Sequence, residues 1–146
     1  MTRMGFEPNR RLAKDYHNVR VEDTIGDKHY WFRSKLEHKL AQYLQLMKDT
    51  EYIKSWYYEN TRFKFPDSSW LVDFMVRNND NTVEFWEAKG LCEADTKRKI
   101  KLLAKYRPEV VITMVFQNKR DMEKFGKYKA FCKRVCLIKE LTRGII

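Results

Sequence analysis

The longest regular pattern of apolar side chains lies between residues 31 and 48. Apolar residues recur there at spacings of four, four, four and three, at Phe32, Leu36, Leu40, Leu44 and Met47. Positions three and four apart share one face of an α-helix, so this spacing predicts a helix with one buried face. Glu37 and His38 lie at the border of that face.

Three stretches in the middle of the chain are typical of β-strands. Residues 55–65 are rich in aromatic side chains, and a turn is expected within them at Glu59-Asn60. Residues 70–77 and 82–88 flank a run of turn-forming residues, Asn78-Asn79-Asp80-Asn81, and therefore predict a hairpin.

The last third of the chain predicts two further helices and a buried strand. One helix starts near Asp95 and stops before Pro108, and the apolar, β-branched run 110–116 follows as a strand. A third helix is expected from Asp121 to about Val135, with a short last strand over 135–138. The predicted order is α-β-β-β-α-β-α, an α/β fold with a mixed sheet flanked by helices.

Composition places most of the chain in one folded domain. Its residues are 43% hydrophobic, which is enough to form a core. The length of 146 residues is too short for two separate cores. Residues 1–30 are polar and weakly periodic, so we expect an N-terminal basic arm over 1–30 and a single domain over 31–146. No run approaches the roughly 20 apolar residues of a membrane span, and no secretory signal is recognisable, so a cytoplasmic location is expected.

The positive charge is concentrated toward the C-terminus. The net charge is +10, and residues 88–146 carry 16 basic and 6 acidic side chains, which equals the whole excess. A basic chain rich in aromatic residues favours a polyanionic partner, of which nucleic acid is the commonest. A lysine-rich surface that only keeps the protein in solution is the alternative.

Four residues form a candidate chemical site. Asp73 interrupts an otherwise apolar strand, where a carboxylate is costly to bury without a cation or metal partner. Glu87 and Lys89 lie two apart on the return strand of the hairpin, on the face that comes alongside Asp73. Glu37, on the preceding helix, is placed to complete the cluster. Carboxylates suit a hard cation such as magnesium, and this arrangement serves phosphodiester hydrolysis.

Each of these residues alone has an ordinary structural explanation. A Glu-x-Lys pair is common on exposed strands, and a single helix glutamate is most often solvated. The combination is stronger, because Asp73 and the Glu87-Ala88-Lys89 run fall on adjacent predicted strands.

The pattern resembles the PD-(D/E)xK nuclease superfamily, with Val72-Asp73 in place of Pro-Asp and Glu87-Ala88-Lys89 as the second half. Within it, the chain is more similar to the phage endonuclease I family of Holliday-junction resolvases. The resemblance covers residues 31 to about 118 and extends weakly to 135. It rests on the segments Phe32-Arg33-Ser34-Lys35-Leu36-Glu37, Asp73-Phe74, Lys89-Gly90-Leu91, Pro108-Glu109 and Val115-Phe116.

This resemblance implies a restriction-endonuclease-like fold and a metal-dependent endodeoxyribonuclease. Glu37, Asp73, Glu87 and Lys89 would form its active site, with the three carboxylates holding magnesium, for which manganese can substitute. It also implies a homodimer that cuts branched DNA and exchanges strands near residues 55–65 between subunits.

Basic residues near the candidate site predict contacts with DNA. The helix after Lys89 carries five that we assign to phosphate binding: Lys97, Arg98, Lys99, Lys101 and Lys105. Arg33 and Lys35, beside Glu37, are further candidates. Like charges four residues apart destabilise a helix unless a polyanion faces them.

Three alternatives remain open from the sequence. A homing-type or other sequence-directed phage endonuclease would share the catalytic core. A non-catalytic DNA-binding protein would keep only the fold. An RNA-directed nuclease would differ in substrate.

Overall fold

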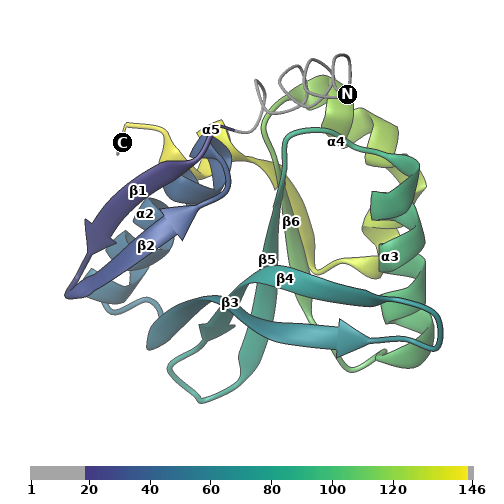
Figure 1. Cartoon of the computed structure of the whole chain (residues 1–146), viewed down its shortest axis with the longest axis horizontal. Helices are drawn as coiled ribbons and strands as arrows, with labels where there is room; N and C mark the ends of the chain where they lie inside the picture. The colour runs from purple at the N-terminus through teal and green to yellow at the C-terminus, as the bar shows by residue number, and fades with distance from the viewer. Residues whose placement is uncertain (1–18, 145–146) are drawn as a thin grey trace, which may run out of the picture.

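The structure is a computed structural model that describes residues 19–144. Its strands are β1 (Val21–Ile25), β2 (Lys28–Phe32), β3 (Ser55–Lys64), β4 (Ser69–Arg77), β5 (Val83–Lys89), β6 (Ile112–Phe116) and β7 (Arg134–Leu137). Its helices are α2 (Lys35–Asp49), α3 (Ala94–Tyr106), α4 (Lys119–Phe125), the 3-10 helix η1 (Gly126–Phe131) and α5 (Ile138–Thr142) (Figure 1).

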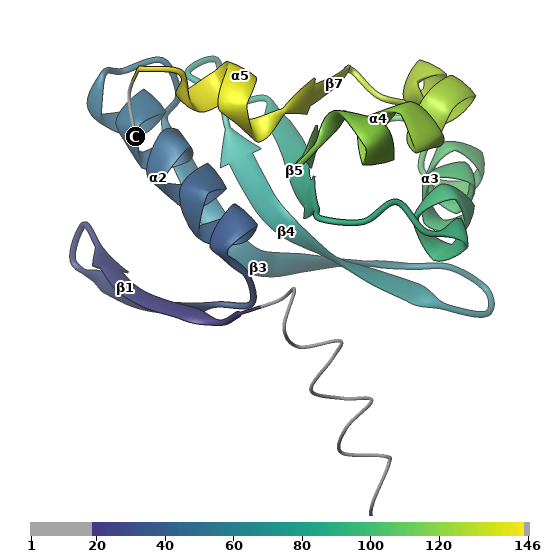
Figure 2. The ribbon, with the colours of Figure 1, turned by 90° about the horizontal axis from the view of Figure 1, so that it is seen from above.

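Five strands form the central mixed sheet, in the order β3-β4-β5-β6-β7. The strand β4 is antiparallel to both β3 and β5, whereas β5, β6 and β7 run parallel to one another. The helix α3 makes the crossover from β5 to β6, which parallel strands require. Figure 2 shows α2 on one side of the sheet and α3 and α4 on the other. The expected α/β class, with a mixed sheet and flanking helices, is confirmed.

The predicted order of elements is incomplete at both ends. Strands β1 and β2 form a separate two-stranded hairpin before α2, inside the stretch where an arm was expected. The boundary expected at residue 30 falls within β2, and residues 1–18 of the expected arm lie outside the described residues. The turn Gly26-Asp27, with Gly26 at φ 66°, joins the two strands. The helix α5 follows β7 and was not predicted.

The helix expected over residues 121–135 is wrong in its extent. The helix α4 ends at Phe125, because Gly126 adopts a positive φ of 54° that leaves the right-handed helical region. The chain continues as the tighter helix η1. Likewise, the turn expected at Glu59-Asn60 is a β-bulge within the single strand β3, with Glu59 at φ 50°.

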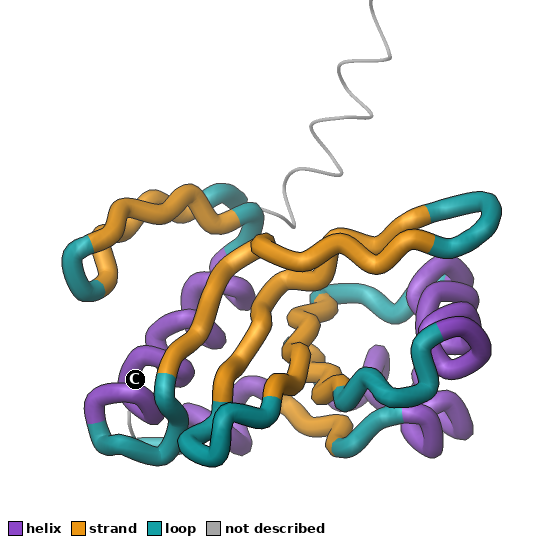
Figure 3. The backbone as a smooth tube through the Cα atoms, turned by 90° about the horizontal axis from the view of Figure 1, so that it is seen from below, coloured by secondary structure: helices purple, strands orange, loops and turns teal. Residues whose placement is uncertain are grey.

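Two apolar cores lie on opposite faces of the sheet, and β4 contributes to both. Phe74 and Val76 belong to the core under α2, whereas Trp70 and Val72 belong to the core under α3. The side chains of β4 switch from one core to the other at Asp73, which lies opposite the bulge in β3. Beyond this point the hairpin of β3 and β4 extends away from α2 and reaches α3, where Ser68 contacts Arg98 and Phe65 contacts Tyr106, and Figure 3 shows the long hairpin projecting from the sheet. Between residues 19 and 144, no helix is long and apolar enough to cross a membrane.

Candidate active site

The strands β4 and β5 stop pairing through their backbones at the place where Asp73 and Glu87 lie. Their ladder ends at Phe74 and Trp86, and continuing the same register would bring Asp73 opposite Glu87. Here the side chains bridge the strands instead. Glu87 Oε1 accepts a hydrogen bond of 2.9 Å from the backbone N–H of Asp73, and Asp73 Oδ2 accepts one of 2.8 Å from Ala88. The two carboxylates therefore occupy the gap between diverging strands.

Lys89 joins this pair from the end of β5. Its Nζ lies 3.2 Å from Glu87 Oε2, and the indole N–H of Trp70 donates to the same oxygen at 3.3 Å. The parallel pairing of β5 with β6 continues as far as Lys89 opposite Phe116, so the backbone of Lys89 is held while its side chain remains 27% exposed. The amine can therefore reach a molecule that approaches from outside.

Glu37 faces the cluster from the first turn of α2. Ser34 caps this helix by accepting a hydrogen bond from the Glu37 N–H at 3.1 Å. Oε1 of Glu37 accepts hydrogen bonds from the hydroxyl of Tyr58 and from the backbone N–H of Arg33. The helix cap and the bulged strand β3 thus fix the position of this carboxylate.

The cluster carries more negative charge than Lys89 offsets. Burial, followed by the charges of Glu87 and Glu37, raises the pKa of Asp73 well above its usual value. Burial is also the main cause of the raised pKa of Glu37, to which Glu87 adds. Burial alone would lower the pKa of Lys89, but the carboxylates of Glu87 and Asp73 raise it. The amine is therefore an ammonium ion at neutral pH.

By its chemistry, this donor set fits a hard divalent cation. It consists of three buried carboxylates, and among the described residues Asp73 Oδ1 and Glu37 Oε2 have no hydrogen-bond donor. In the arrangement seen, however, no three His, Cys, Asp or Glu side chains between residues 19 and 144 are grouped closely enough to hold a metal ion. Glu87 Oε1 accepts the hydrogen bond from the backbone N–H of Asp73, so a metal ion held by all three carboxylates would have to compete with this bond.

The predicted DNA-binding residues of α3 fall into two groups. Asp95 in the first turn pairs with Arg98 at 2.6 Å and with Lys99 at 3.3 Å, so these two are partly neutralised within the helix. Among the described residues, Lys97, Lys101 and Lys105 have no acidic partner. The helix expected to start near Asp95 begins at Ala94, with Glu93 as its N-cap.

Arg33 and Lys35, the other predicted DNA contacts, lie at the start of α2. Lys35 is exposed, and Arg33 pairs with Glu59 of the bulge in β3 at 3.0 Å while its backbone N–H holds Glu37. His38 forms a hydrogen bond with Asp23 of β1 at 2.7 Å.

Sequence reasoning missed two aromatic residues of the site. Tyr58 and Trp70 fall in the predicted strands 55–65 and 70–77, and Trp70 is only 2% exposed. Their polar atoms, however, bond Glu37 and Glu87. A buried tyrosine or tryptophan needs a hydrogen-bond partner, but nothing local in the sequence says which one it finds.

The chain is similar in sequence to a phage protein. Endonuclease I of Escherichia phage T7 is 28% identical to it over 115 aligned positions, and the match covers 70% of this chain and 68% of the relative. No family model and no solved structure matches. The similarity supports a relationship to a phage nuclease.

Proposed function

We propose that the protein is a metal-dependent DNA endonuclease that hydrolyses phosphodiester bonds. The observation that carries this proposal is the meeting of Asp73, Glu87 and Lys89 where β4 and β5 diverge, with Glu37 facing them from α2. The similarity to a phage endonuclease supports it independently of the geometry.

In this proposal the three carboxylates hold magnesium, and manganese substitutes because it accepts similar oxygen ligands. The bound ion supplies Lewis-acid activation of the phosphoryl group and of a water molecule. Lys89 is an ammonium beside Glu87, so it acts as a cation that orients the water or offsets charge on a phosphate oxygen. Tyr58 and Trp70 are positioning residues that hold Glu37 and Glu87.

The proposed substrate is branched DNA, cut by a homodimer in which each subunit cleaves one strand. Basic residues at the start of α2 and along α3 bind phosphates on both sides of the site. A sequence-directed endonuclease with the same core, and a DNA-binding protein without catalysis, are the alternatives that the first experiment separates.

That experiment compares cleavage of a four-way junction, a linear duplex and single-stranded DNA of matched sequence in magnesium. We expect paired, symmetric cuts in the junction and little cutting of the duplex. Cutting of the duplex at one sequence would identify a sequence-directed enzyme, and cutting of a matched RNA in preference to DNA would identify an RNA-directed one.

The metal requirement is tested on the same junction. Manganese should support cleavage, whereas calcium should support binding with little cutting because its coordination is looser. Equal turnover in calcium, or cleavage that persists in EDTA, would contradict the proposed chemistry. Sedimentation equilibrium of the protein alone tests the dimer.

A further inference from the structure

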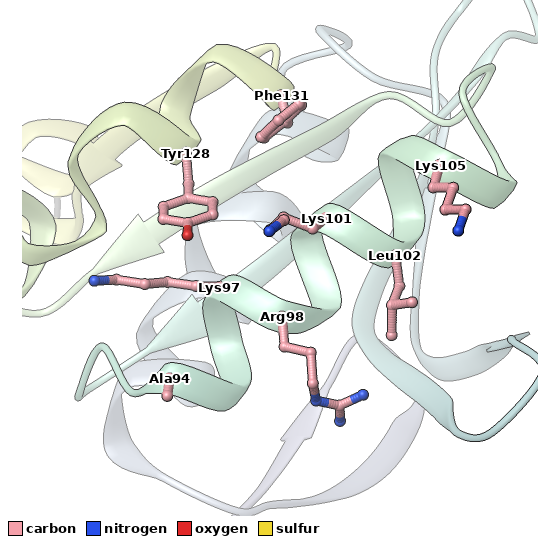
Figure 4. Close-up of a pocket in the computed structure, with 8 residues that line it drawn as sticks. All are labelled: Ala94, Lys97, Arg98, Lys101, Leu102, Lys105, Tyr128 and Phe131. Atoms are coloured by element: carbon pink, nitrogen blue, oxygen red, sulfur yellow. The ribbon is translucent and has the colours of Figure 1, made fainter.

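A groove runs along the outer face of α3, between this helix and η1. Its volume is about 530 Å³, within the range of small-molecule sites. Its lining, drawn in Figure 4, combines four basic residues of α3 with two aromatic rings of η1: Ala94, Lys97, Arg98, Lys101, Leu102, Lys105, Tyr128 and Phe131. The groove thus has rings and aliphatic stems along its walls and ammonium groups at its rim.

The aromatic rings are accessible and already face cations. Phe131 is 49% exposed, so its ring is open to a ligand. Lys97 Nζ lies 5.7 Å from the centre of the Tyr128 ring, and Lys127 Nζ lies 5.9 Å from it. The centres of Tyr128 and Phe131 are 6.3 Å apart with their planes tilted by 45°, so each presents a separate face to a ligand.

The charge of the groove selects its occupant. Its lysines have no acidic partner among the described residues, so a partner must be anionic. A second copy of this chain is disfavoured, because the chain carries a net charge of +10. An anion with flat apolar groups satisfies both the lysines and the rings. Double-stranded DNA offers only its phosphates, because its bases are stacked on one another.

The groove also leads away from the candidate active site. The negative charge of Asp95, in the first turn of α3, acts on Lys89. From Ala94 to Lys105 the helix rises about 17 Å. A DNA strand that passes Lys89 can therefore continue along α3.

We propose that the groove between α3 and η1 binds an unpaired nucleotide of the DNA substrate, with its base stacked on Phe131 or Tyr128 and its phosphates on Lys97 and Lys101. This inference rests on the proposed function in taking DNA as the substrate. Stacking of a base on an aromatic side chain is independent of sequence, so the groove selects DNA with unpaired bases near the cut.

The test measures binding in EDTA, so that cleavage plays no part. The probe is a short oligothymidylate carrying a single 2-aminopurine, whose fluorescence is quenched when it stacks on an aromatic ring. The variants Phe131→Leu and Tyr128→Leu keep an apolar side chain but remove the ring. Tyr52→Leu, at a side chain 72% exposed in the loop after α2, is the matched control.

We expect the wild-type protein and the control to quench the probe. The double variant Phe131→Leu/Tyr128→Leu should lose the quenching and bind the oligonucleotide about tenfold more weakly. Its affinity for a duplex of the same length should stay within about twofold, since the phosphate contacts are unchanged. If the double variant unfolds at a lower temperature than the wild type, the single variant Phe131→Leu takes its place, because this position is half-exposed. It should lose part of the quenching and part of the affinity for the oligonucleotide.

Quenching that survives in the double variant would overturn the inference, as would equal losses of affinity for single strand and duplex. Displacement of the probe by polyglutamate more readily than by unlabelled oligothymidylate would instead identify an acidic protein as the partner. If the protein cuts junctions but does not quench the probe, the proposed function is supported and this inference is wrong. If the protein quenches the probe but cuts no DNA, the proposed function is wrong and the binding of an unpaired nucleotide in the groove is still supported.

Discussion

Two buried acids on β5 have opposite surroundings, although they are only three residues apart. Glu84 accepts hydrogen bonds from Trp86, Asn78 and Lys133, at 2.8, 3.0 and 2.9 Å. Burial would raise the pKa of Glu84, but these hydrogen bonds lower it below its usual value. Glu87 shares its site with two other carboxylates and a single amine, and there the pKa of Asp73 is raised.

The difference supports the proposal that Glu84 is a structural acid and that the cluster around Glu87 is functional. Both acids have donor partners, but Glu84 has Lys133 to itself, whereas Glu87 shares Lys89 with the nearby carboxylates of Asp73 and Glu37. The cluster of Glu37, Asp73 and Glu87 has one cation, Lys89, for three carboxylates, and such an imbalance of buried charge is typical of functional sites. The two ends of β5 can therefore be distinguished by their response to the same kind of substitution.

The largest expected effect is the loss of activity in Asp73→Asn. This change keeps the shape of the side chain and its acceptor for the Ala88 N–H, but removes the charge. Junction cleavage in magnesium should fall about 100- to 1,000-fold, for the loss of about 3–4 kcal/mol of transition-state stabilisation. Glu84→Gln is the control and should keep its activity within a few-fold. Nicking at an unchanged rate by Asp73→Asn would refute the enzyme interpretation.

The stabilities should change in opposite directions at the two sites. Glu84→Ala leaves the N–H groups of Trp86 and Asn78 without an acceptor, so the free energy of unfolding should fall by about 2–3 kcal/mol. Asp73→Asn relieves repulsion between carboxylates and should raise it by about 1 kcal/mol in EDTA. Urea unfolding at neutral pH measures both. A destabilised Asp73→Asn would mean that the cluster is structural.

The pH dependence of stability should also have opposite signs. Because the folded-state pKa of Glu84 is lowered, its contribution is complete above the unfolded value of about 4.3 and is lost as the pH falls below it. Because the folded-state pKa of Asp73 is raised, its cost is absent below about pH 3.9 and grows as the pH rises above that value.

Melting temperatures in EDTA between pH 3 and pH 7, at steps of about one unit, check this pair of signs. The advantage of Asp73→Asn over wild type should widen with rising pH, and the deficit of Glu84→Gln should widen over the same range. If the melting temperatures of Asp73→Asn and the wild type differ by the same amount at every pH, the charge argument is wrong.

The smallest effect concerns the lysines of α3. Lys101→Ala should weaken DNA binding uniformly across sequences and reduce the slope of log affinity against log salt by about 1. Lys54→Ala is the control, because Lys54 Nζ bonds Asn81 near the turn between β4 and β5, at the Glu84 end of the sheet. Equal slopes for both variants would remove α3 from the DNA interface.

Local patterns predicted the elements that carry the site. The apolar spacing from Phe32 to Met47 predicted α2, and alternation around a turn-forming run predicted the hairpin of β4 and β5. These succeeded because helix and strand periodicity act over a few residues. The hairpin of β1 and β2 was missed, although Gly26-Asp27 is a turn signal, because half of the residues in its strands are polar and only Phe32 among them is buried.

The sequence by itself determined which residues carry charge, which face of each element is apolar, and that Asp73, Glu87 and Lys89 fall on neighbouring strands. Only the tertiary structure decided that the bulge in β3 and the divergence of β4 from β5 open a gap that these carboxylates fill. It also decided that Tyr58 and Trp70 complete the site and that η1 brings its rings beside α3. Such contacts join residues far apart in the chain, so they depend on how the two cores pack and leave no periodic signal in the sequence.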